Sequence, residues 1–240
     1  MSEFSLSKLW EREEGAMESC YKLYTWINHT LLMLLLQIFW KMSQISDYFK
    51  EKRGMIQRCG HKLPPIKSFI SLGGQHQGVY GLPHCMAVSH KTCDYIRELL
   101  NYAAYQRWLQ LSLVQATYWH DPLSEEEYKR KSIFLADINN ELTINETYRS
   151  NLQKLESFVM VKFDRDSMVQ PRESEWFGFY KPGQASQLQT LQQSKIYTED
   201  RLGLQAMDRA GKLAFLSQPG DHLQFDETWF IDNIINKYLV

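Results

Sequence analysis

The sequence predicts an α/β domain with a largely parallel sheet. Three short apolar runs have the composition of buried strands: Ile66–Leu72, Ser157–Phe163 and Lys212–Ser217. Stretches typical of helix separate these runs, and strands that alternate with helices usually form a parallel sheet with the helices packed against it. The length of 240 residues suits one domain with a substantial core.

The segment before the first strand has a helical pattern. Met1–Arg53 is rich in long apolar side chains and poor in β-branched ones, and the composition changes near Lys50–Pro65. Its apolar run His29–Trp40 is shorter than the roughly 20 residues of a membrane span and begins too late for an ordinary signal peptide. A buried or interfacial helix, a displaced signal-type segment and a non-native exon all fit this run.

Four further helices are expected after the first strand. They are Cys93–Gln115, Leu123–Tyr128, Asn145–Glu156 and Glu227–Leu239. In the second of them, Ser124 lies three residues before Glu127, which is the spacing of a capping box.

Composition excludes several classes of function. The 27 Lys and Arg nearly balance the 28 Asp and Glu, so nothing indicates nucleic acid or an anionic membrane as a partner. The four cysteines form no CxxC pair, and we expect neither a metal nor a cofactor. Cys85 and Cys93 can form a loop-closing disulfide or be two buried thiols. Asn28 and Asn145 stand in glycosylation sequons, which are informative only in a secreted protein.

Two polar loops follow predicted strands and carry the residues of a candidate site. Asp166 comes after the second strand, and His222 after the third. In open α/β sheets, functional groups cluster at the carboxyl ends of strands. A histidine with a pKa of about 6.5 can move a proton near neutral pH, and a carboxylate on its far nitrogen fixes its tautomer. Taken alone, a loop aspartate is usually a turn former and a loop histidine usually a solvated side chain.

The order of these residues matches part of a known pattern. In α/β hydrolases the serine nucleophile comes first along the chain, then the acid, then the histidine before the last helix. Asp166 and His222, followed by the predicted helix Glu227–Leu239, match the second and third members.

Six strings resemble the palmitoyl-protein thioesterase family, and in particular its lysosomal type 1 branch. They are SLGGQHQGVYGLPHC, LVQATYWHDP, SIFLADIN, SEWFGFY, YTEDRLGL and GDHLQ. The resemblance starts near Ile56 and continues to the C-terminus, over about three-quarters of the chain. It implies the C-terminal part of an α/β-hydrolase fold at residues 56–240, preceded by a divergent helical segment at residues 1–55.

The resemblance also implies a function and a site. The family hydrolyses thioesters between fatty acyl chains and protein cysteines through an acyl-serine intermediate, so palmitoylated proteins are the expected substrates. By position, Asp166 and His222 match the catalytic acid and base. An insertion at about residues 73–156 is expected to form an acyl-binding region, with Trp119, Met168 and Val169 as lining candidates, although Trp119 is equally suited to core packing.

Further features of the family fall on individual residues. The resemblance implies a Cys85–Cys93 disulfide and a glycan on Asn145, which suit an oxidising compartment. It implies a lysosomal location reached through the secretory pathway, although the chain has no clear N-terminal signal peptide. Cys59 matches a half-cystine whose partner is expected in the part of the family that this chain does not match.

The sequence departs from the family where the nucleophile is expected. Glu51–Met55 (EKRGM) stands in place of the GxSxG elbow, and no GxSxG occurs anywhere in the chain. The family's first strands and oxyanion-forming glycine loop are also unmatched, and oxyanion donors contribute roughly 3–4 kcal/mol to the transition state. Without a serine the pair has no hydroxyl to activate. Three interpretations follow: a truncated thioesterase, a catalytically inactive variant that binds acyl chains or a partner, and a fragment that does not fold.

Overall fold

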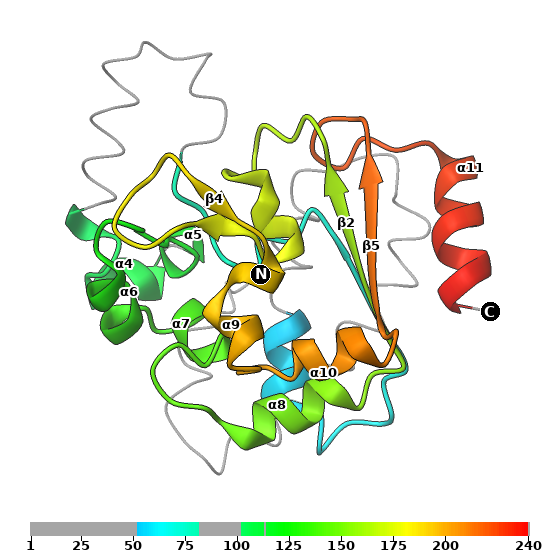
Figure 1. Cartoon of the computed structure of the whole chain (residues 1–240), viewed down its shortest axis with the longest axis horizontal. Coiled ribbons are helices and arrows are strands. Elements are labelled where there is room, and N and C mark those ends of the chain that lie inside the picture. The colour runs from blue at the N-terminus through cyan, green and yellow to red at the C-terminus, as the bar shows by residue number, and fades with distance from the viewer. Residues whose placement is uncertain (1–51, 82–101, 113, 240) are drawn as a thin grey trace, which may run out of the picture.

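A three-stranded parallel sheet forms the centre of the molecule (Figure 1). The structure, a computed structural model, describes residues 52–81, 102–112 and 114–239. The strands lie in the order β1 (Ser68–Leu72), β2 (Ser157–Phe163) and β5 (Leu213–Gln218). Sequence analysis predicts β2 residue for residue and the other two to within two residues at each end. The predicted α/β class and parallel sheet are therefore confirmed.

The strand register brings the carboxyl ends of β2 and β5 together. Ser68 pairs with Ser157 at the start of β1, and Phe163, the last residue of β2, pairs with Gln218 at the end of β5. In Figure 1 the loops that leave β2 and β5 lie side by side at the top of the sheet. These are the two loops that carry Asp166 and His222.

Both faces of the sheet are covered, so the central strand β2 is buried on each side. Phe158 and Met160 point into one apolar cluster, and Val159, Val161 and Phe163 point into another, all with no exposed surface. A parallel strand buried on both faces has a nearly continuous apolar run instead of an alternating one. This is the reason that the sequence SFVMVKF was recognisable as a strand.

Different helices cover the two faces. On the Phe158 face lie the helix at residues 52–59 and the helices α8 (Glu146–Gln153), α9 (Lys195–Thr198) and α10 (Leu204–Arg209). On the other face lie α11 (Glu227–Phe230) and the π-helical segment η5 (Ile231–Leu239), at the right of Figure 1. The terminal helix is thus present where it was predicted, but its hydrogen-bond pattern widens from Ile231 onward.

The segment predicted as an insertion has a core of its own. It contains the short helices α4 (Arg107–Ser112), α5 (Val114–Thr117), α6 (Glu125–Lys131) and α7 (Leu135–Ile138). The segment contains an apolar cluster separate from those on the sheet, and the largest buried side chains of this cluster are Trp119, Tyr128, Leu135 and Ile138. Its role as an acyl-binding region stays a prediction at this point.

A buried histidine joins this helical segment to a small hairpin, β3 (Phe179–Tyr180) with β4 (Leu188–Gln189). The His120 ring is stacked between Tyr128 at 3.8 Å and Phe179 at 4.2 Å between ring centroids. Its Nδ1 lies 2.7 Å from the Gln77 carbonyl oxygen, and its Nε2 lies 2.9 Å from the Glu125 carboxylate. Each ring nitrogen therefore lies within hydrogen-bonding distance of an acceptor oxygen, and these contacts hold the ring in place.

The prediction of a single helix over Cys93–Gln115 is wrong in the part that the structure describes. The chain turns at residues 104–105 before α4 begins. Tyr105 is buried, and its hydroxyl accepts a hydrogen bond of 2.9 Å from the backbone N–H of Asp121. This tertiary contact outweighs the local helical preference of the segment.

The predicted capping box is also wrong. Ser124 does occupy the N-cap position of α6, but its side chain makes no capping hydrogen bond. Glu127 does not reach back to it either, because its carboxylate accepts a hydrogen bond of 2.7 Å from Lys131 one turn later. In the described part of the chain there are also the 3₁₀ turns η3 (Arg172–Trp176) and η4 (Leu191–Gln193). No helix among the described residues is long and apolar enough to cross a membrane.

Candidate active site

The structure brings Asp166 and His222 together, although they are 56 residues apart in the sequence. Asp166 lies in the loop after β2 and His222 in the loop after β5. The Asp166 Oδ2 and the His222 Nδ1 are 2.5 Å apart, a short hydrogen bond. The Asp166 side chain has no exposed surface, and that of His222 is 11% exposed. The strand register predicts this meeting, because adjacent parallel strands end at the same edge.

The local backbone holds the Asp166 carboxylate in place. Its Oδ1 accepts hydrogen bonds from the backbone N–H groups of Met168 at 2.7 Å and Val169 at 2.8 Å. Burial of Asp166 opposes its ionisation, but the hydrogen bond from His222 and those from its own loop outweigh burial and lower its pKa. Asp166 is therefore held as an anion beside the imidazole.

His222 is fixed from three sides. Its backbone N–H donates to the Asp221 carboxylate at 2.7 Å, and the same carboxylate accepts from the backbone and hydroxyl of Ser167 in the Asp166 loop. Gly73, just after β1, lies against the ring at a φ of +61°. A Cβ there would be 2.8 Å from the His222 Cε1, so glycine is required by both conformation and space.

One nitrogen of the imidazole is left for chemistry. With Nδ1 bound to Asp166, the other nitrogen, Nε2, is buried and has no hydrogen-bond partner among the described residues. A histidine oriented in this way accepts a proton at Nε2 and is stabilised as an imidazolium by the carboxylate at Nδ1. The arrangement is that of a general base with its orienting acid.

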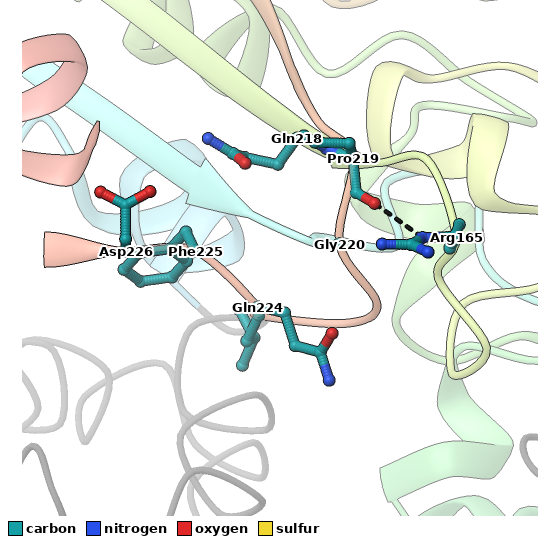
Figure 2. A pocket seen from close by; sticks show the side chains of 8 residues that line it. Arg165, Gln218, Pro219, Gly220, Gln224, Phe225 and Asp226 are labelled. Atoms are coloured by element: carbon teal, nitrogen blue, oxygen red, sulfur yellow. Dashed lines mark hydrogen bonds between the residues drawn. The ribbon is translucent and has the colours of Figure 1, made fainter. Parts of the chain in front are cut away.

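The three acyl-groove candidates differ in exposure. Trp119 is 1% exposed inside the core of the helical segment, and Val169 is also buried, whereas Met168 is 37% exposed beside Asp166. A surface hollow of about 520 Å³ flanks the His222 loop, and Figure 2 shows it between Arg165 on one side and Phe225 and Asp226 on the other. None of the three candidates lines this hollow. Their role in acyl binding stays a prediction.

The remaining predicted residues have simpler outcomes. Cys85, Cys93 and Asn28 lie outside the described residues. Asn145 is exposed at the N-cap of α8, and Cys59 is disulfide-bonded. Among the residues that the structure describes, no three His, Cys, Asp or Glu side chains are grouped as metal ligands would be.

Two residues of the site were missed by sequence reasoning. Gly73 follows the predicted strand Ile66–Leu72, and Glu175 lies within SEWFGFY; neither residue is predicted to belong to the site. Glu175 is 1% exposed, and its Oε2 accepts a hydrogen bond of 2.9 Å from the backbone N–H of Phe163 at the end of β2. A glutamate between a serine and a tryptophan gives no sequence signal of such burial.

A parallel sheet with an Asp–His pair at its carboxyl edge, the histidine preceding the last helix, defines the α/β-hydrolase class. A model of the family described as palmitoyl protein thioesterase matches residues 51–222, well over half of the chain. The chain therefore belongs to the palmitoyl-protein thioesterase family, as the strings of the sequence predict.

Individual relatives agree with this assignment. The chain is similar to Palmitoyl-protein thioesterase 1 of Caenorhabditis elegans, with 45% identity over 188 residues, 78% of this chain and 62% of the relative. It is 35% identical to Palmitoyl-protein thioesterase 3 of Dictyostelium discoideum over 171 residues, 71% of this chain and 56% of the relative. It is 28% identical to Lysosomal thioesterase PPT2-B of Xenopus laevis over 157 residues, 65% of this chain and 53% of the relative. The chain thus spans about three-fifths or less of the length of these relatives.

Proposed function

We propose that the chain hydrolyses thioesters between fatty acyl groups and protein cysteines. The observation that carries the proposal is the Asp166–His222 pair at 2.5 Å, in a member of a thioesterase family. The substrates that follow are palmitoylated proteins or peptides. The acid and base use no metal or cofactor in this chemistry.

The proposed reaction uses the free nitrogen of His222. The Nε2 removes the proton from a nucleophilic hydroxyl as the oxygen attacks the thioester carbonyl, and Asp166 stabilises the imidazolium that forms. The C–S bond then breaks and the cysteine leaves as a thiol, taking the proton from His222. In the second half, His222 removes a proton from water as the water oxygen attacks the acyl carbonyl. The bond between the acyl carbon and the nucleophile oxygen then breaks, that oxygen takes the proton back from His222, and the free fatty acid is released. The chain contains no GxSxG sequence to supply the hydroxyl.

Acyl binding is proposed for the region beside this pair. Met168 is the candidate best suited to it, because its side chain is partly exposed and its backbone N–H is bound to the Asp166 carboxylate. Val169 is its buried neighbour. Trp119 has the burial of a packing residue, and its lining role requires a separate test.

A second candidate function is binding without turnover. The absence of a GxSxG sequence favours it, because an acid–base pair without a hydroxyl has nothing to activate. In this second function, the chain would bind acyl chains or a partner protein through the helical segment at residues 73–156.

The test is hydrolysis of an S-palmitoylated peptide by the purified 240-residue chain. The release of free thiol measures the hydrolysis. We expect thiol release that His222→Ala abolishes, because His222 is the base of the proposed reaction. Turnover that survives His222→Ala would overturn the proposal. Saturable palmitate binding without hydrolysis would instead support the binding function, and a folded chain that neither binds nor hydrolyses would exclude both.

We also propose that the protein enters the secretory pathway and is delivered to the lysosome. Relatives named lysosomal thioesterases support this location, as do the disulfide at Cys59 and the exposed Asn145 sequon. The cap of α8 uses only the Asn145 Oδ1, which accepts from the backbone N–H groups of Thr147 at 3.0 Å and Tyr148 at 3.3 Å. The amide nitrogen that would carry a glycan is not used by the cap.

Two substitutions at this sequon separate the glycan from the helix cap. Thr147→Ala is expected to remove the glycan without loss of stability, whereas Asn145→Ala removes the glycan and the cap and lowers stability by about 1 kcal/mol. Glycosidase-sensitive mass of protein from secreting cells measures the first effect. Urea unfolding of unglycosylated protein measures the second. A protein whose mass is unchanged by Thr147→Ala would argue against a glycan at Asn145.

A further inference from the structure

Glu175 is a buried carboxyl group that the proposed reaction does not use. It lies on the 3₁₀ turn η3, and two hydrogen bonds connect this turn to β2. The Glu175 Oε2 accepts from the backbone N–H of Phe163 at 2.9 Å, and the Trp176 indole N–H donates to the Met160 carbonyl at 3.0 Å. The turn therefore presents the Glu175 carboxyl group to the carboxyl end of β2, where the Asp166 loop begins.

The second oxygen of Glu175 has an unusual environment. Oε1 is enclosed and receives no hydrogen bond from any N–H or O–H group of the described residues. The ionisable group that acts most strongly on Glu175 is the Asp166 carboxyl, whose charge and hydrogen bond, next to burial, raise the pKa of Glu175. Two ionised carboxylates in a buried site repel each other, so one proton must be shared between them. A proton on either group would turn the repulsion into a hydrogen bond.

The hydrogen-bond donors decide which group holds the proton. Asp166 accepts from the backbone N–H groups of Met168 and Val169 and from the His222 ring, and each of these bonds favours its ionised form. Among the residues that the structure describes, Glu175 accepts a hydrogen bond only from the backbone N–H of Phe163. Burial, together with the adjacent Asp166 charge, accordingly raises the pKa of Glu175 to about 10, while the pKa of Asp166 is lowered.

The remaining charged groups around Glu175 do not reverse this assignment. Lys162 on β2 is the nearby cation that favours ionised Glu175. Its Nζ, however, lies 3.5 Å from the Asp164 carboxylate and 4.4 Å from the centre of the Trp176 ring. His222 on the β5 side is bound to Asp166 and not to Glu175. Lys162 is thus shared with a competing carboxylate.

We propose that Glu175 is a positioning residue that stays protonated at neutral pH and donates its carboxyl proton to Asp166. This inference rests on the proposed function for its catalytic meaning, but not for its protonation. The neutral acid adds a fourth hydrogen bond to Asp166, which helps Asp166 to stay ionised in an acidic compartment and to hold His222 in the tautomer with a free Nε2.

The pH dependence of stability tests the protonation directly. A Glu whose pKa is raised from 4.5 to about 10 binds its proton in the native state but loses it in the unfolded chain between these values. Stability therefore falls as pH rises through this range. Glu175→Gln places a neutral amide that can accept from Phe163 and donate to Asp166, and it lacks this dependence.

We expect the unfolding equilibrium constant of the unaltered chain to rise about tenfold per pH unit relative to that of Glu175→Gln, between about pH 5 and pH 8. Urea unfolding at a series of pH values measures the ratio. The matched control is Glu173→Gln on the same turn, where the carboxylate is partly exposed beside Arg172, and there no such trend is expected. Parallel pH curves for the unaltered chain and Glu175→Gln would overturn the proposal.

A second measurement observes the protonation of Glu175 in the unaltered chain directly and does not depend on stability. The ¹³C signal of the Glu175 side-chain carboxyl, assigned by its absence from Glu175→Gln, is expected to stay at the position of a protonated acid through neutral pH. A signal that titrates in the ordinary range of a glutamate would overturn the proposal whether or not the chain is active.

The positioning role is tested by hydrolysis of the S-palmitoylated peptide. Glu175→Gln is expected to keep the activity, and Glu175→Met, which fills the site without a donor, is expected to lower kcat about tenfold or more and to move the acid limb of the pH profile upward. Equal activity of the Met and Gln variants would overturn the positioning role. Absence of hydrolysis by the unaltered chain, with Glu175 protonated in both measurements above, would count against the proposed function alone.

Discussion

Asp166→Asn is expected to lower kcat for thioester hydrolysis by about 10⁴-fold with little change in fold. The asparagine Oδ1 can still accept from the backbone N–H groups of Met168 and Val169, so the loop keeps its shape. Its amide nitrogen, however, donates to His222 Nδ1 where the carboxylate accepted. The imidazole is then forced to carry its proton on Nε2, where it cannot act as a base, and the loss of about 10⁴-fold is the effect of this wrong tautomer in Ser-His-Asp enzymes.

The same loop offers a matched control for this substitution. Asp164 is two residues earlier, its side chain is 45% exposed, and it pairs with Lys162 at 3.5 Å. Asp164→Asn is expected to leave hydrolysis unchanged, because an exposed ion pair contributes little and Asp164 does not contact His222. Thiol release from a palmitoylated peptide measures both variants. Comparable activity of Asp166→Asn and the unaltered chain would remove Asp166 from the catalytic pair.

The sheet was predictable from sequence because its signals are local. β2 is buried on both faces, so every residue from Phe158 to Val161 is apolar, and this short run is bounded by polar residues. The meeting of Asp166 and His222 then follows from parallel topology, because neighbouring strands end at one edge. The catalytic roles predicted for them rest on the resemblance, since a single loop aspartate and a single loop histidine carry little information.

The features that sequence analysis missed depend on distant partners. The turn before α4 is set by the Tyr105 hydroxyl, whose partner Asp121 lies 16 residues later. Glutamate is a residue type that is usually exposed. The burial of Glu175 depends on its packing against the end of β2 and the Asp166 loop. No local pattern in the sequence encodes these contacts. The same limit applies to Gly73, whose need for glycine comes from the approach of His222.

Trp119→Ala is expected to destabilise the chain by about 3–5 kcal/mol, the cost of removing a large aromatic side chain from a core. Trp119 is 1% exposed in the core of the helical segment, with its ring centroid 5.4 Å from that of Tyr80. Its backbone also forms an isolated parallel bridge with Val79, which the substitution retains. Urea unfolding followed by circular dichroism measures the loss. Tyr102→Ala, at an aromatic side chain that is 81% exposed, is the control and is expected to cost less than about 0.5 kcal/mol.

Trp119 is interpreted either as a core residue or as a residue that lines the acyl site. Measuring substrate preference together with stability separates these two interpretations. A tryptophan that only packs the core affects stability, and Trp119→Phe then hydrolyses short and long acyl thioesters in the same ratio as the unaltered chain. A tryptophan that lines the acyl site changes this ratio, because each buried methylene of the acyl chain contributes about 0.8 kcal/mol to binding. We expect the ratio to stay constant, since a side chain with 1% exposure presents no surface to a ligand in this conformation. A preference shifted toward longer chains in Trp119→Phe would show instead that the core of the helical segment opens to admit the acyl group.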